Sequence, residues 1–156
     1  MGITKNEQAI LRGAMESEYG DQSDIDGGAT WTFSAIEHSG LDGKVAAGVI
    51  SSLVKKGLAI VEDDGEKDGS GEPLTSFNIT PLGHAYLKYL PIMVWDTKKW
   101  AFKVEICVAA VATFEPLPVI REAFITKREN AVAWLDQAMV ELARVMHDAK
   151  AIANAQ

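Results

Sequence analysis

The chain has 156 residues, 47% of them hydrophobic, a single cysteine and a formal net charge of −7. This length suits one domain, or a small domain with an appendage, and the lone Cys107 excludes an internal disulfide framework. No apolar run approaches the roughly 18–20 residues that span a bilayer, and the first residues lack a signal-peptide pattern, so we expect a cytoplasmic protein that does not bind membranes.

The chain is predicted to begin with a helix, an acidic loop, a strand and a second helix. Thr4 and Glu7 form a capping box that opens the first helix. The loop over 20–28 has aspartates, but their spacing does not fit an EF-hand. A short strand over 29–33 and a helix over 34–39 follow. The first helix is expected to bury these residues: Ile10, Leu11, Ala14, Met15 and, at its end, Tyr19.

A third helix is predicted over 42–56, after a turn at Ser39 and Gly40. Aliphatic residues recur there every fourth position, and we expect them on one buried face: Leu41, Val45, Val49 and Leu53. Gly57 ends this helix because glycine tolerates the positive φ found just beyond a helix terminus. Strands over 58–62 and 74–79 then enclose a polar, glycine-rich turn, which predicts a β-hairpin. Thr80 and Pro81 start a further helix that Pro91 ends.

The remaining residues predict a linker over 91–99 and a ββα appendage over 100–156. Residues 100–113 alternate in polarity, which indicates a strand; a buried helix that uses Trp100, Val104, Val108 and Val111 is the competing interpretation. A turn over 114–118 leads to a strand over 119–125 and then to a long helix that ends near 152. The expected buried face of this helix comprises Ala131, Leu135, Ala138, Met139, Leu142, Val145, Met146, Ala149 and Ile152.

No catalytic, metal or cofactor motif is present in the sequence. The three histidines, His38, His84 and His147, fall in separate predicted elements, so no zinc-ligand spacing exists. Glycine-rich phosphate loops and nucleophile motifs are also missing. We therefore expect a binding protein that uses no cofactor and no metal, and we keep an enzyme only as a nominal alternative.

The order of elements over about residues 3–90 resembles a winged helix-turn-helix domain of the MarR/PadR type. The resemblance rests on Leu53, Lys56, Gly57 and Leu58 after the third helix, and on the second pattern of Ile79, Thr80, Gly83 and Leu87. It implies a winged domain over 1–90 within an α+β fold and does not extend to the 91–99 linker or to the ββα part over 100–156. We expect the ββα part to be a dimerisation element because its long helix is amphipathic and because the family dimerises. It also implies a small homodimeric transcriptional regulator that binds double-stranded DNA through the 42–56 helix.

The expected DNA-contacting residues lie on the outward side of that helix and at the hairpin tip. They are Gly43, Lys44, Ala47, Gly48, Ser51, Ser52, Lys55 and Lys56, with Lys67 in the wing. Lysines and serines suit phosphate contacts, and the small residues allow close approach to the groove.

The charge distribution supports an alternative function. Residues 1–90 hold 7 Lys and Arg against 14 Asp and Glu, whereas residues 91–156 hold 8 of each. DNA-binding domains are usually basic, and the expected contact face has no Arg, Asn or Gln for bidentate base contacts. The alternative is an acidic winged-helix module, of a kind that would suit a phage protein, that binds or inhibits a protein partner without binding DNA.

Overall fold

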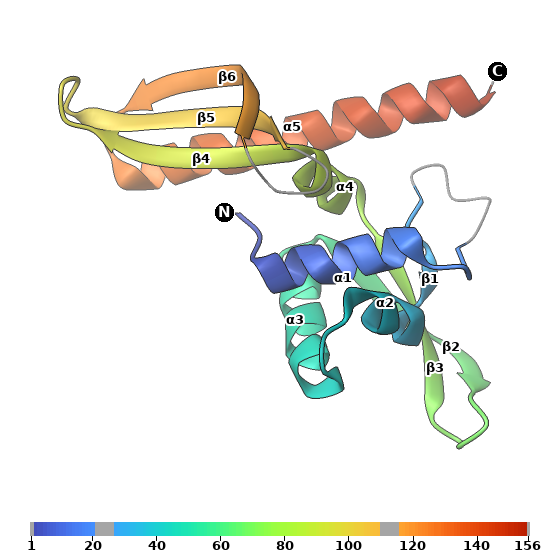
Figure 1. The fold of residues 1–156 in the computed structure, drawn as a ribbon. Coiled ribbons are helices and arrows are strands. Elements are labelled where there is room, and N and C mark those ends of the chain that lie inside the picture. The colour runs from blue at the N-terminus through green and yellow to red at the C-terminus, as the bar shows by residue number, and fades with distance from the viewer. Residues whose placement is uncertain (1, 21–26, 110–115, 156) are drawn as a thin grey trace.

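The computed structural model describes residues 2–20, 27–109 and 116–155 and has a mixed α+β fold with two antiparallel sheets (Figure 1). The first part comprises α1 (Lys5–Glu16), β1 (Thr30–Trp31), α2 (Thr32–Ser39), α3 (Gly43–Lys55), β2 (Ala59–Lys67), β3 (Pro73–Ile79) and α4 (Pro81–Lys88). The second part comprises β4 (Tyr89–Asp96), β5 (Ala101–Ala109), β6 (Pro116–Ile125) and α5 (Arg128–Ala155). The predicted α+β class is confirmed. Most of the predicted acidic loop lies outside the described residues.

In the first part, α1, α2 and α3 enclose a core that is closed by a sheet of order β1-β3-β2. The predicted capping box is present, because the Glu7 backbone N–H donates to the Thr4 hydroxyl at 3.1 Å and the Thr4 N–H donates to the Glu7 carboxylate at 2.9 Å. Met15 and Tyr19 are exposed, contrary to the sequence prediction. Since α1 ends at Glu16, Tyr19 lies beyond the helix and its ring meets the ring of Phe33 instead of the core.

The buried face of α3 differs from the predicted one. Ala46, Ile50 and Leu53 are buried, whereas Val45 is 46% exposed and Val49 is only half-buried. A strict four-residue spacing advances about 40° around a helix at each step, because a helix has 3.6 residues per turn. The series that starts at Leu41 therefore winds around α3 and cannot stay on one face.

The C-terminus of α3 is closed by the glycine stop that the sequence predicts. Gly57 has φ +75°, and its N–H donates to the Val54 carbonyl at 3.1 Å. The Leu58 N–H donates to the Leu53 carbonyl at 2.9 Å. These two bonds form a Schellman motif, which turns the chain sharply into β2.

Most of the predicted 91–99 linker is a strand, so that prediction is wrong. The helix α4 ends at Lys88, and β4 continues directly from Tyr89 to Asp96 in antiparallel register with β5. Pro91 pairs with Ile106 in that register. The sheet order is β4-β5-β6, so Pro91 lies on an edge strand, where the missing N–H is tolerated. The prolines of β6 lie on the other edge strand for the same reason, and β6 begins at Pro116 rather than at Val119.

The second part is therefore a βββα unit and not the predicted ββα unit. The alternating strand is confirmed as β5, and its helical alternative is excluded over the described residues of this segment. Helix α5 runs behind the sheet and extends past it (Figure 1). The first half of the predicted α5 face is buried, including Leu135 and Met139, but Val145 is 59% exposed. Leu142 and Ala143 are buried and Met146 packs against the core, so Val145 lies on the outward side of α5.

Helix α4 connects the two parts, because it packs against α5 while its chain leads directly into β4. The buried residues form one continuous cluster that extends from Leu11 and Leu53 through Ala85 to Leu135. Tyr86 of α4 is buried, and this burial, together with Asp136 of α5, raises the pKa of its phenol to about 12. No helix within the described residues has the length and apolar character needed to cross a membrane.

Candidate nucleic-acid interface

Helix α3 presents one side that none of the described elements covers. Asp42 caps its N-terminus, where the carboxylate accepts from the Lys44 backbone N–H at 2.8 Å. Spacings of three, four and seven residues along a helix place side chains on one face, and the exposed residues of α3 follow them. This exposed face comprises Lys44, Ala47, Gly48, Ser51 and Lys55, with Gly43 at the start of the helix. The structure thus brings six of the eight predicted contact residues of α3 and its end to one exposed surface.

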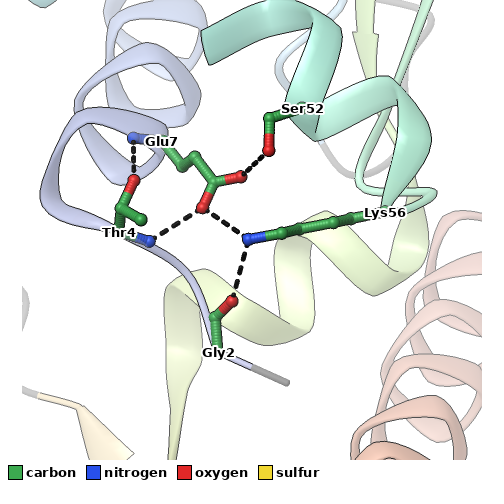
Figure 2. A network of polar contacts seen from close by, with 5 residues as sticks. All are labelled: Gly2, Thr4, Glu7, Ser52 and Lys56. Atoms are coloured by element: carbon green, nitrogen blue, oxygen red, sulfur yellow. Dashed lines mark hydrogen bonds and ion pairs between the residues drawn. The ribbon is translucent and has the colours of Figure 1, made fainter.

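Ser52 and Lys56, the other two predicted contact residues, are turned away from this face and toward α1. Figure 2 shows both side chains turned toward the carboxylate of Glu7 on α1. The Ser52 hydroxyl donates to Glu7 Oε2 at 2.9 Å, and the Lys56 ammonium donates to Glu7 Oε1 at 2.8 Å. Lys56 also donates to the Gly2 carbonyl at 3.3 Å. Their hydrogen-bonding capacity is used to fix α1 against α3.

The Glu7 carboxylate is held in its charged form. Its side chain is 3% exposed, and that of Lys56 is 36% exposed. Burial raises the pKa of Glu7, but hydrogen bonds from Lys56, Thr4 and Ser52 outweigh this effect, so the pKa lies below its ordinary value of 4.5. A buried charge needs such partners, because an unpaired one carries a large desolvation cost. The capping role of Glu7 is visible in the sequence, whereas its bonds to α3 depend on how the two helices pack.

The β2–β3 hairpin extends away from the rest of the molecule and ends in an acidic turn (Figure 1). Lys67 is exposed there, as predicted, but exposed carboxylates surround it in the sequence. Hydrogen bonds from Ser70 and from the backbone at 70 and 72 lower the pKa of Asp68, so that this carboxylate stays charged. The exposed acidic residues of the turn are Asp63, Glu66, Asp68 and Glu72.

Two apolar residues on the flanks of the exposed α3 face were not anticipated. Val45 and Val54 are both exposed and lie on either side of the line from Lys44 to Lys55. Only the position of α3 in the core identifies them, because by type they would be assigned to the buried face. The exposed surface of α3 is thus a strip of small residues and two lysines between two valines.

Within the described residues, no group of three or more His, Cys, Asp or Glu side chains is placed to hold a metal ion. Cys107 is buried, and burial together with the nearby Glu105 raises the pKa of its thiol. Comparison with protein-family models, with curated proteins and with solved structures gave no match.

Proposed function

We propose that residues 4–88 form a winged helix-turn-helix domain and that the protein binds double-stranded DNA as a small regulator. The observation that carries the proposal is the uncovered face of α3, on which Lys44 and Lys55 flank a strip of small residues. The strand order β1-β3-β2 and the hairpin between α3 and α4 are compatible with a wing beside this helix.

The proposed contacts are mainly to the DNA backbone. Lys44 and Lys55 lie about three helical turns apart and would each reach a phosphate, while Ala47, Gly48 and Ser51 let the helix approach the major groove. This face has no Arg, Asn or Gln, and its two lysines are the only side chains that could contact a base edge by a charged group. We therefore expect modest sequence discrimination and strong dependence on salt.

The test is binding of duplex DNA at low ionic strength by the wild type and by a Lys44→Gln, Lys55→Gln variant. The slope of log K against log salt is negative, and loss of two phosphate contacts should make it less steep by about 1.8. The matched control is Lys5→Gln with Lys88→Gln, which removes two exposed lysines elsewhere and leaves the slope nearly unchanged. A wild type that fails to bind at low salt, or an α3 variant that behaves like the control, would refute the proposal.

A specific feature favours a second function, in which the domain docks on a protein and does not bind DNA. The carboxylates of the β2–β3 turn would repel phosphates, and the exposed Val45 and Val54 give α3 apolar contact area. In this case, Val45→Ser with Val54→Ser would abolish capture of the partner, whereas neutralising the two lysines would leave it intact.

A further inference from the structure

The turn between β4 and β5 places aromatic rings and cations together at the end of the second sheet. We define the hairpin tip as Trp95, Lys98, Lys99, Trp100 and Phe102, with Phe124 beside it on β6. In Figure 1 this turn lies at the end of the sheet that is remote from α4 and from the β2–β3 hairpin. The hairpin tip therefore belongs neither to the core of the first part nor to the exposed face of α3.

The most exposed ring of the hairpin tip belongs to Trp100. Its side chain is 71% exposed, and its backbone has φ +55°, a left-handed conformation that is unusual for a bulky residue. Its ring lies edge-to-face against Trp95 with 5.5 Å between centroids, and Trp95 lies 4.8 Å from the ring of Phe102 in the same way. The indole is thus supported from one side and open to solvent.

The turn is also ordered by hydrogen bonds between the Asp96 side chain and the backbone of the turn. The Asp96 carboxylate accepts from the N–H groups of Lys98 and Lys99 at 2.9 and 3.0 Å. The Lys99 ammonium lies 4.0 Å from the centroid of the Phe124 ring. A ligand that contacts the hairpin tip therefore meets groups that are already positioned, which reduces the entropy lost on binding.

The local charge is opposite in sign to that of the whole chain. Residues 95–103 and 124–129 meet at this end because Phe102 pairs with Ile125 and Lys103 pairs with Phe124. Together they hold five Lys and Arg and two Asp and Glu, whereas the chain carries −7. Lys103 is paired with Glu105 and Glu122, so the local excess of positive charge comes from Lys98, Lys99, Lys127 and Arg128. The remaining surface repels an anionic polymer and the hairpin tip attracts it.

We propose that the hairpin tip binds unpaired nucleic acid, with a base stacked on Trp100 and the flanking phosphates held by Lys98 and Lys99. Exposed aromatic rings between cations are the combination that binds single strands, because every base offers a π-face and each nucleotide carries one charge. Unpaired bases are required, because neighbouring pairs cover the base faces within a duplex. The exposed face of α3 has no aromatic side chain, so this site differs from the proposed duplex site and does not depend on it.

The experiment measures binding of a labelled oligothymidylate of about 12 nucleotides to the full chain at low salt, a length within the range of known single-strand sites. Trp100→Ala should weaken binding by about 5- to 150-fold, the range measured for loss of one stacked base. Trp100→Tyr should restore most of it, because a phenol ring also stacks. Phe33→Ala, which removes another exposed ring, is the matched control and should change little. Lys98→Gln with Lys99→Gln should lower the salt slope by about 1.4.

Four outcomes would overturn the proposal. They are failure of the wild type to bind the oligonucleotide at low salt, equal affinities for the wild type and Trp100→Ala, Trp100-dependent binding only to anionic lipid vesicles, and Trp100-dependent self-association without oligonucleotide binding. The Lys44 and Lys55 variant separates the two sites, because it should lose duplex binding and keep oligothymidylate binding. Trp100→Ala should do the reverse.

Discussion

Replacing Glu7 with glutamine removes the carboxylate that is buried between α1 and α3 while it keeps the shape of the side chain. In the wild type, this carboxylate accepts from the Thr4 N–H, the Ser52 hydroxyl and the Lys56 ammonium at 2.9, 2.9 and 2.8 Å. Glutamine keeps one oxygen as an acceptor. Its NH2 group faces either the Thr4 N–H and the Lys56 ammonium, which cannot accept from it, or the Ser52 hydroxyl, which can, and in both cases Lys56 loses the negative charge opposite it.

The expected loss of stability is about 2 kcal/mol. A hydrogen bond to a charged group contributes about 1.5–3 kcal/mol, and breaking a fully buried ion pair costs about 3–5 kcal/mol. Lys56 is 36% exposed and can turn toward water when Glu7 is neutral, so the loss should be smaller than for a fully buried pair. Glu7→Ala, which also removes the capping acceptor and leaves a cavity, should cost about 3 kcal/mol.

The measurement is urea unfolding followed by circular dichroism at several pH values. The folded-state pKa of Glu7 lies below its ordinary value of 4.5, so its charge stabilises the fold above that pH and the contribution is lost as the pH falls through the folded pKa. Glutamine does not titrate. The difference in unfolding free energy between wild type and Glu7→Gln should therefore be full near neutral pH and should shrink in acid.

Glu16→Gln is the matched control, because Glu16 lies on the same helix and is exposed. Its effect should stay within about 0.5 kcal/mol. A double-mutant cycle of Glu7→Gln with Lys56→Met should give a clear coupling energy. Equal losses for Glu7→Gln and Glu16→Gln, or a difference that does not change with pH, would refute the argument.

Three further predictions concern packing. Ile50→Ala should lower the unfolding free energy by about 2–4 kcal/mol, whereas Val45→Ala should change it by less than about 0.5 kcal/mol; equal losses in urea unfolding would contradict the observed α3 face. Gly83→Ala should destabilise the fold by about 1–3 kcal/mol because the added Cβ would overlap the Leu58 backbone carbonyl. The Cβ of Gly48→Ala meets nothing within 4 Å, so this change should stabilise α3 by up to about 1 kcal/mol. Thermal melts of the two variants compare these effects directly. The Cys107 thiol should react slowly with a maleimide in the native protein, because burial restricts access and raises its pKa; labelling as fast as in urea would disprove this.

The sequence alone determined the elements whose signals are local. The capping box of Thr4 and Glu7, the stop at Gly57 and the helix start at Pro81 each depend on residues a few positions apart. Alternating polarity was sufficient to identify β5, because the period of a strand differs from that of a helix. The exposed positions of Lys44 and Lys55 also followed from sequence, since long charged side chains are seldom buried.

Tertiary structure decided the features that depend on which surfaces meet. Pro91 ends a helix pattern locally, yet β4 tolerates it because the strand lies at a sheet edge, and the edge is defined only when β5 and β6 have paired. The rotation of α3, which exposes Val45 and buries Ile50, is set by contact with α1 and the sheet and not by the spacing of aliphatic residues. The same contact brings Ser52 and Lys56 to the Glu7 carboxylate, which is 45 or more positions away in sequence. A buried carboxylate needs hydrogen-bond donors, and only the packing of α1 on α3 determines which donors are near it.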